Sequence, residues 1–174
     1  MYLKYSGHPR RHTRQDLVNM HILLTGASGH VGSHTLIALM EWAVVKRITA
    51  VDVVPLPSHI HLDERAQFSL ADLTDIAVLD ELFDSIPPCD ALIHLGAIPN
   101  PETLDHRLVH NINVSSNYNI LHTATIRGVR KIVQASSVNA IGLSYTAPEH
   151  RWFEEVPMDE TALCKPEDAY ALSK

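Results

Sequence analysis

The sequence predicts an α/β fold built on a doubly wound parallel sheet, with helices on both of its faces. Short apolar runs alternate with segments of helical periodicity, which is typical of consecutive strand–helix–strand units. A turn with three glycines, Gly26, Gly29 and Gly32, joins the first strand to the first helix. A second apolar run ends at the acidic residue Asp52. These observations predict one domain over residues 20–174.

Five strands and three helices are expected. The strands are predicted at 21–25, 47–52, 66–70, 90–95 and 130–136, and the helices at 30–42, 75–85 and 103–127. Asp72 to Asp75 supply capping residues before the second helix, and Gly128 stands where a cap belongs after the third. The predicted strand order is 3-2-1-4-5, with a ligand over the carboxyl ends of the strands where the order reverses.

Length and composition restrict the class of protein. At 174 residues one domain is expected, and a hydrophobic fraction of 45% suffices for a buried core. The formal net charge of −6 argues against nucleic-acid binding, and no apolar run is long enough for a membrane span. Cys89 and Cys164 are too few for a disulfide framework, so we expect a reducing compartment and a cytoplasmic protein.

Two segments depart from the alternating pattern. Residues 1–19 carry four basic side chains against one acid. They are expected to be a disordered extension, with a mitochondrial presequence as the alternative. Residues 144–168 hold three prolines and seven acidic residues. They predict a long solvated loop near the mouth of the site.

The three-glycine turn is the strongest indication of a ligand. Gly26 permits a tight turn, Gly29 lets the backbone approach a phosphate, and Gly32 lets the helix pack closely on the strand. The helix then offers free N–H groups and the positive end of its dipole to the pyrophosphate of a dinucleotide. The spacing G-x-x-G-x-x-G differs from the G-x-G-x-x-G of ordinary dehydrogenases, so a glycine-rich turn without a ligand is the alternative.

Asp52 indicates which dinucleotide fits. It lies 20 residues after Gly32, where a carboxylate accepts hydrogen bonds from the adenosine ribose hydroxyls. Because a carboxylate there repels a 2′-phosphate, NAD is favoured over NADP. A turn residue at the end of a strand is the alternative interpretation of Asp52.

The C-terminal residues carry an acid–base pattern. Tyr170 and Lys174 are four positions apart and share one face of a helix. A nearby ammonium favours phenolate, so Tyr170 can take a proton from a substrate hydroxyl or return it. Lys174 would also hold the nicotinamide ribose, and Ser137 would hydrogen-bond the substrate oxygen. An ordinary amphipathic helix face is the alternative for the Tyr–Lys pair alone.

Taken together, residues 20–174 resemble the extended short-chain dehydrogenase/reductase family, in its NAD-dependent epimerase/dehydratase branch, whose members have a Rossmann fold. The resemblance rests on these segments: Thr25–Gly32, Asp52, Ala71–Leu73, His94–Ala97, Asn113 with Val114 and Asn119, Ala135–Ser137, and Tyr170–Lys174.

The resemblance implies an NAD-dependent oxidoreductase or epimerase that transfers hydride between nicotinamide and a secondary alcohol of a small, sugar-like substrate. It implies a catalytic set of Ser137, Tyr170 and Lys174, with Ser137 and Asn139 toward the substrate. The implied cofactor contacts are Gly26, Ser28, Gly29, His30, Val31, Gly32, Asp52, Asp72, Leu73, Leu95, Gly96, Ala97, Asn113 and Lys174. Family members often dimerise through the helix predicted at 103–127, which implies a homodimer here.

Departures from the family pattern restrict these expectations. Ile141 stands where related epimerases usually carry Tyr, and other details are similar to uronate dehydrogenase-like members, so no substrate is named. Family members run well past Lys174. We therefore expect that the substrate domain is absent, that the catalytic helix frays and that this chain alone is nearly inactive. A dinucleotide-binding module without catalysis is the alternative, and no metal site is expected.

Overall fold

Five parallel strands form the centre of the computed structural model, which describes residues 19–102, 104–151 and 156–174. Their order is β3-β2-β1-β4-β5, which confirms the predicted order. The strand bounds are Met20–Thr25 for β1, Val45–Asp52 for β2, Ala66–Leu70 for β3, Ala91–His94 for β4 and Lys131–Gln134 for β5. All but one residue of the predicted extension at 1–19 lies outside the described residues.

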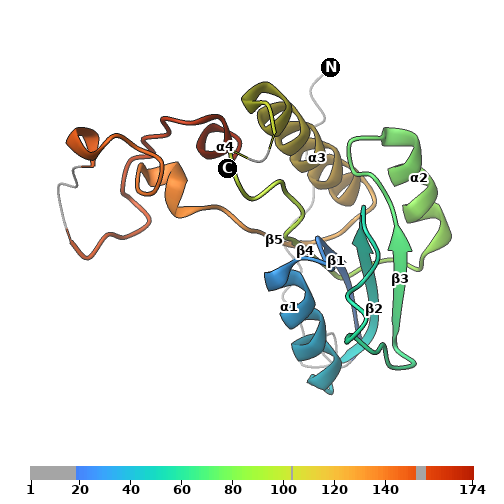
Figure 1. Cartoon of the computed structure of the whole chain (residues 1–174). Coiled ribbons are helices and arrows are strands. Elements are labelled where there is room, and N and C mark those ends of the chain that lie inside the picture. The colour runs from blue at the N-terminus through green and yellow to red at the C-terminus, as the bar shows by residue number, and fades with distance from the viewer. Residues whose placement is uncertain (1–18, 103, 152–155) are drawn as a thin grey trace, which may run out of the picture.

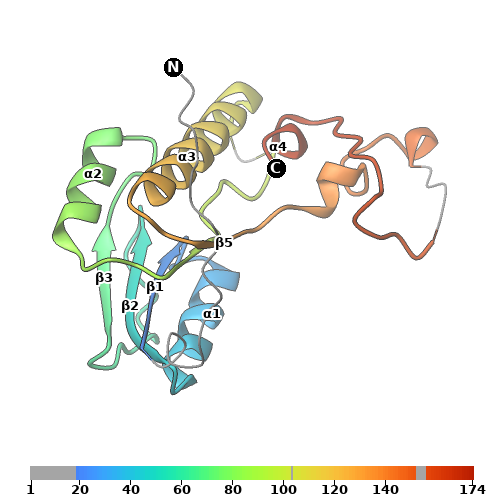
Figure 2. The ribbon, with the colours of Figure 1, turned by 180° about the vertical axis from the view of Figure 1, so that it is seen from behind.

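The helices lie on both faces of the sheet (Figures 1 and 2). The α-helix bounds are His30–Glu41 for α1, Ile76–Ser85 for α2, His106–Ile126 for α3 and Ala169–Leu172 for α4. Two 3₁₀ turns follow the sheet, η2 at Val138–Ile141 and η3 at Pro148–His150. The first three helices start and end within three residues of their predicted bounds.

Successive residues of β1 point into two different cores, as the alternation of a strand requires. Leu23 packs in a cluster whose helical members come from α2 and α3, including Leu79, Phe83 and Ile120. Ile22 and Leu24 pack on the opposite face, in a cluster that contains Leu36 and Leu39 of α1. Burial on both faces explains why β1 reads as a continuous apolar run.

Two expected elements end sooner than predicted. The sequence predicts the fifth strand over 130–136, whereas β5 ends at Gln134, because Ser137 caps η2 by accepting a hydrogen bond from the Asn139 N–H. A helix of about two turns was expected from Pro166. The structure has one turn, α4, because Asp168 is its N-cap and its carboxylate accepts from the Ala171 N–H.

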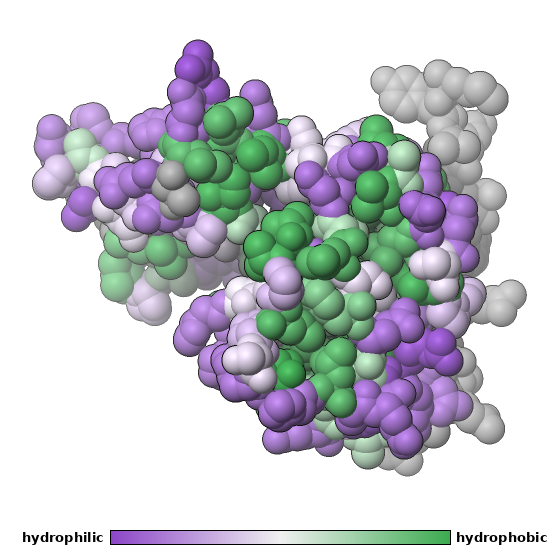
Figure 3. Space-filling view, turned by 45° about the vertical axis from the view of Figure 1, so that its right-hand side comes forward, coloured by the Kyte–Doolittle hydropathy of each residue, from purple (hydrophilic) through white to green (hydrophobic). Residues whose placement is uncertain are grey.

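The described parts of the predicted loop, 144–151 and 156–168, project from the body as a lobe, and hydrophobic residues gather between lobe and body in the space-filling view (Figures 1 and 3). The two ends of the loop are joined to each other, and the second end is also joined to η2. The Glu167 carboxylate accepts from the Ala147 N–H at 3.2 Å and pairs with His150 at 2.7 Å, and the Lys165 N–H donates to the Ala140 carbonyl. Across the described part of the chain, no helix combines the length and apolar character needed to traverse a bilayer.

The Arg65 side chain bonds to the end of α1 and to the start of β2. The Arg65 guanidinium donates to the carbonyls of Met40, Trp42 (3.2 Å) and Val45 (2.8 Å). It is oriented by the Asp63 carboxylate, which accepts from the Arg65 Nε at 3.0 Å. This contact fastens α1 to the β2–β3 connection, far from the carboxyl ends of the strands.

We expect Arg65→Ala to lower the free energy of unfolding by about 2 kcal/mol, because several carbonyls lose a charged donor at once. Urea unfolding followed by circular dichroism measures the change. Arg107→Ala is the matched control, since Arg107 pairs with Asp105 while its side chain is 86% exposed. The control should have no measurable effect. Equal destabilisation by both variants would contradict the role given to Arg65.

Candidate functional site

The three glycines of the first turn meet different surroundings. Gly26 has φ +72°, and a Cβ there would lie 2.5 Å from the Gly96 backbone nitrogen. A Cβ on Gly32 would overlap the Gly26 carbonyl oxygen. A Cβ on Gly29 would approach protein only at the Gly26 oxygen, at 3.3 Å. Packing therefore requires the first and third glycines, whereas the second borders open space at the start of α1.

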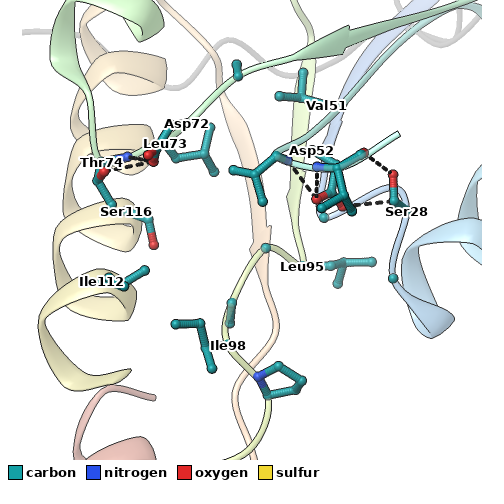
Figure 4. Close-up of a pocket in the computed structure, with 18 residues that line it drawn as sticks. Ser28, Val51, Asp52, Asp72, Leu73, Thr74, Leu95, Ile98, Ile112 and Ser116 are labelled. Carbon is teal, nitrogen blue, oxygen red and sulfur yellow. Dashed lines mark hydrogen bonds between the residues drawn. The ribbon is translucent and has the colours of Figure 1, made fainter. Parts of the chain in front are cut away.

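A cavity of about 300 Å³ opens beside this turn. It lies between the loop before α1, the ends of β2 and β3, the segment after β4 and the side of α3 (Figure 4). Nine of the predicted cofactor residues line it: Gly26, Ser28, Gly29, Asp52, Asp72, Leu73, Leu95, Gly96 and Ala97. The cavity follows the strands' carboxyl ends, where the sequence places a ligand.

Other predicted residues lie outside the lining of this cavity. His30 and Val31 are exposed in the first turn of α1, and Gly32 is buried beneath them. Asn113 is fully buried in α3, and Lys174 follows α4. The individual roles assigned to these residues, as to those in the cavity, stay predictions.

Asp52 fastens the glycine turn to the end of β2. Its Oδ2 accepts from the Ser28 N–H at 2.9 Å, and its Oδ1 accepts from the N–H groups of Val53 (2.7 Å) and Val54 (3.3 Å). The Ser28 hydroxyl donates to the Val54 carbonyl at 2.8 Å (Figure 4). Asp52 is thus a turn residue at the end of a strand, which was the alternative to a role in ribose binding. It also borders the cavity.

The far end of the cavity is held by α3. The Asn119 amide donates to the carbonyls of Leu73 (3.1 Å) and Thr74 (3.2 Å), and the Asp72 carboxylate accepts from the Thr74 N–H at 2.9 Å. These bonds fix the backbone path after β3, so the wall formed by Leu73 has a defined position.

Two asparagines of α3 hold the segment after β4 and the segment that ends in Lys174. Asn113 accepts from the Ile98 N–H at 2.8 Å and donates to the Ser173 hydroxyl at 3.0 Å. Asn117 contacts the buried His94 ring through Oδ1 at 2.7 Å and donates to the Ser173 carbonyl at 3.1 Å. Burial lowers the pKa of His94, and the nearby Lys174 charge lowers that pKa further.

The Lys174 side chain lies near Tyr170, although α4 ends at Leu172 and Lys174 is not on the helix whose face the two residues were predicted to share. Tyr170 is 9% exposed, and the Lys174 Nζ lies 5.9 Å from the centroid of its ring. Burial lowers the pKa of Lys174. Ser137 is half-buried at the start of η2, and Asn139 is buried within η2, which contacts α4. The structure therefore brings the two segments that carry the predicted catalytic residues, η2 and α4, into contact.

Sequence reasoning missed several residues of the site. The unpredicted lining residues are Val51, Val53, Val54, Ala71, Thr74, Ile98, Pro99, Ile112 and Ser116. The sequence does carry one sign of Val53 and Val54, because two apolar residues directly follow the acid that ends β2. In the structure both are more than half exposed. Ile112 and Ser116 are one helical turn apart and share a face of α3. Among the described residues, no group of three or more potential ligands could hold a metal.

Comparison with known proteins gives these features a family. A model of the NAD dependent epimerase/dehydratase family matches residues 22–174. The chain is 28% identical over 163 residues to probable UDP-arabinose 4-epimerase 3 of Arabidopsis thaliana, covering 87% of this chain and 39% of that protein. It is 28% identical over 153 residues to uronate dehydrogenase of Pseudomonas putida, covering 88% of this chain and 51% of that protein.

A solved structure is similar over the same region. It is a short-chain dehydrogenase/reductase superfamily protein from Agrobacterium tumefaciens with bound NAD. The TM-score is 0.68 at 28% identity, covering 88% of this chain and 42% of that one. The chain thus spans between 39% and 51% of these relatives' lengths. Because the family model covers the sheet from β1 to β5 and the segment with Tyr170 and Lys174, the chain belongs to the NAD-dependent epimerase/dehydratase family.

Proposed function

We propose that this chain binds NAD and serves an oxidoreductase or epimerase that acts on a secondary alcohol of a sugar-like substrate. The observation that carries the proposal is the cavity itself, which begins at the glycine turn, passes Asp52 and ends at Leu73. This path suits a dinucleotide with its pyrophosphate at α1 and its adenine near Leu73. The names of the relatives, a UDP-arabinose epimerase and a uronate dehydrogenase, support a sugar-like substrate.

The N-terminus of α1 fits a pyrophosphate. Asp75, Asp105 and Asp168 are the N-caps of α2, α3 and α4, and each accepts backbone N–H bonds through its side chain. The N-cap of α1 is Gly29, which has no such bond, and the first turn of α1 has no acidic residue. Of the four α-helices described, α1 therefore offers its N–H groups and positive dipole end to an anion.

Asp52 supports NAD over NADP. Its carboxylate borders the cavity between the glycine turn and Leu73, where the adenosine ribose would lie. A carboxylate there accepts from the 2′- and 3′-hydroxyls and repels a 2′-phosphate.

Tyr170, Lys174 and Ser137 would supply the acid–base chemistry. Nicotinamide, when bound, supplies hydride transfer to and from the substrate carbon. Tyr170 takes the hydroxyl proton as the alcohol is oxidised and returns it on reduction. The Lys174 ammonium holds the nicotinamide ribose, and the Ser137 hydroxyl stabilises charge on the substrate oxygen. Asn139 would contact the substrate beside Ser137.

Calorimetry with NAD, NADH and NADP on the folded chain tests the binding proposal. We expect NAD to bind at least about tenfold more tightly than NADP, because the 2′-phosphate meets the Asp52 carboxylate. Absence of heat with every nicotinamide coenzyme would overturn the proposal.

Incubation with NAD and a panel of uronates and UDP-sugars tests the chemistry. Net NADH absorbance indicates a dehydrogenase, whereas a changed sugar without net NADH indicates an epimerase. Coenzyme binding without either change on any substrate favours a non-catalytic dinucleotide-binding module.

The homodimer through α3 belongs to the same proposal. Along this helix Leu108, Tyr118 and Ile126 are each more than half exposed. A second copy of the chain packed against that face would cover them.

A further inference from the structure

The segment that carries Tyr170 and Lys174 does not hold itself in place. Its helix, α4, has four residues, which is far below the length at which a helix is stable alone. Ser173, the residue between α4 and Lys174, is nevertheless 5% exposed. Two asparagine side chains of α3 donate hydrogen bonds to it.

A continuous series of hydrogen bonds, here called the hydrogen-bonded chain, connects β1 to Ser173. The Thr25 Oγ1 lies 2.5 Å from the His94 Nδ1, and the His94 Nε2 lies 2.7 Å from the Asn117 Oδ1. The Asn117 Nδ2 then donates to the Ser173 carbonyl at 3.1 Å. All four residues are buried, with exposures of 0% to 8%.

Only one assignment of donors and acceptors fits every bond of the hydrogen-bonded chain. The Ser173 carbonyl only accepts, so the Asn117 amide presents its N–H to Ser173 and its oxygen to His94. The His94 Nε2 must therefore carry the proton, and its Nδ1 accepts from the Thr25 hydroxyl. His94 is a neutral imidazole with both ring nitrogens in use.

The ends of this chain adjoin the two places where the cofactor would be held. Thr25 immediately precedes Gly26 of the glycine turn, and Ser173 immediately precedes Lys174. We propose that His94 and Asn117 are positioning residues that hold the Lys174 backbone at a fixed place relative to the glycine turn. The inference rests on the proposed function, because it assigns the nicotinamide end of the cofactor to Lys174.

Electrostatics agree with this arrangement. A protonated His94 would put a second positive charge near the Lys174 ammonium, inside a region shielded from water. Burial and the Lys174 charge lower the pKa of His94 by more than its hydrogen bond to Asn117 raises it, which agrees with the neutral ring that the hydrogen bonds require. A neutral ring can accept from Thr25 and donate to Asn117 at the same time without repelling Lys174.

Comparing ADP with NADH separates the two ends of the site. ADP reaches the glycine turn and Asp52, whereas NADH also reaches Lys174. We expect Asn117→Leu and His94→Leu to leave the ADP affinity within about twofold and to weaken NADH about tenfold, by loss of one charged hydrogen bond. His94→Gln keeps an N–H for Asn117 and should retain most of the NADH affinity. Calorimetry on the full chain gives both affinities, and circular dichroism checks the fold of each variant.

His21→Leu is the matched control. His21 is another buried imidazole, with ring contacts to the Thr49 hydroxyl at 2.9 Å and the Pro88 carbonyl at 3.1 Å, at the opposite end of β1. The His21→Leu variant should leave the ratio of the ADP and NADH affinities unchanged, even if the substitution lowers the free energy of unfolding. Equal ratios in wild type, Asn117→Leu and His94→Leu would overturn the proposal.

Nitrogen NMR of the His94 ring tests the chain of bonds without any cofactor. We expect the Nε2–H tautomer in the wild type, with a proton that exchanges slowly with water, and faster exchange in Asn117→Leu. An Nδ1–H tautomer would overturn the positioning proposal. Should the wild type bind neither ADP nor NADH while the Nε2–H tautomer is present, the proposed function fails and the hydrogen-bonded chain stands.

Discussion

Gly32→Ala should lower the free energy of unfolding by about 3 kcal/mol, at the upper end of the usual cost of overpacking. The added Cβ would overlap the Gly26 carbonyl oxygen, and its next neighbours are also backbone atoms, of Gly26 and Ala27. Backbone cannot rotate away as a flexible side chain can, so α1 must shift off β1. Urea unfolding followed by circular dichroism measures the loss.

Substitutions at two other glycines separate backbone overlap from the other effects of an added methyl group. Gly128 has φ +84° and open space around its Cβ position, so Gly128→Ala should cost only the left-handed strain of about 1 kcal/mol. Gly29 has an ordinary φ of −70°, and a Cβ there would meet only the Gly26 carbonyl oxygen, at 3.3 Å, so Gly29→Ala should cost far less stability than Gly32→Ala. It should nevertheless lose NAD affinity, because the methyl group enters the proposed phosphate site. A Gly32→Ala protein as stable as Gly29→Ala would contradict the packing account.

The second large effect is expected at Asp52. Asp52→Ala should weaken NAD binding about 10- to 100-fold, because a charged acceptor for the ribose diol is lost. The N–H groups of Ser28, Val53 and Val54 lose the same acceptor, so the glycine turn loosens as well. Asp52→Asn removes the charge but keeps one acceptor oxygen. It should weaken NAD less and narrow the difference between NAD and NADP, as calorimetry with both coenzymes would measure.

Asp159→Asn is the control for this result. Asp159 also caps a turn with its carboxylate, accepting from the Thr161 N–H at 2.9 Å, but it lies in the projecting segment. It should leave both coenzyme affinities unchanged. If Asp52→Ala binds NAD as tightly as the wild type, Asp52 is a turn residue alone, and the preference for NAD loses its basis.

The fold could be predicted because its signals are local. The apolar runs of β1 and β2 are buried on both faces, and Asp75 and Gly128 mark helix ends by chemistry that acts within a few residues. Where prediction went wrong, a cap decided the boundary. Ser137 begins η2 and so ends β5 early, and Asp168 delays α4 until Ala169.

Site residues could be predicted only where the backbone geometry requires a particular residue type at a particular spacing. Gly26 and Asp52 have motif spacing, and the structure places both on one cavity. Ile98 and Ile112 could not be found, because the path of a loop and the tilt of a helix decide what faces a cavity. The bond between His94 and Asn117 joins residues 23 positions apart. Their spacing along the sequence does not reveal this bond, which forms only when α3 packs against the sheet.

The missing side-chain cap at the start of α1 has a practical consequence for every binding measurement suggested above. Whatever oxyanion occupies that helix end shifts the folding equilibrium by mass action. Phosphate or sulfate in the buffer will therefore compete with the coenzyme and raise the melting temperature of the coenzyme-free protein. Titrations should therefore use an amine buffer with chloride. The measured dissociation constant then describes binding of the dinucleotide alone, without displacement of a bound phosphate or sulfate ion.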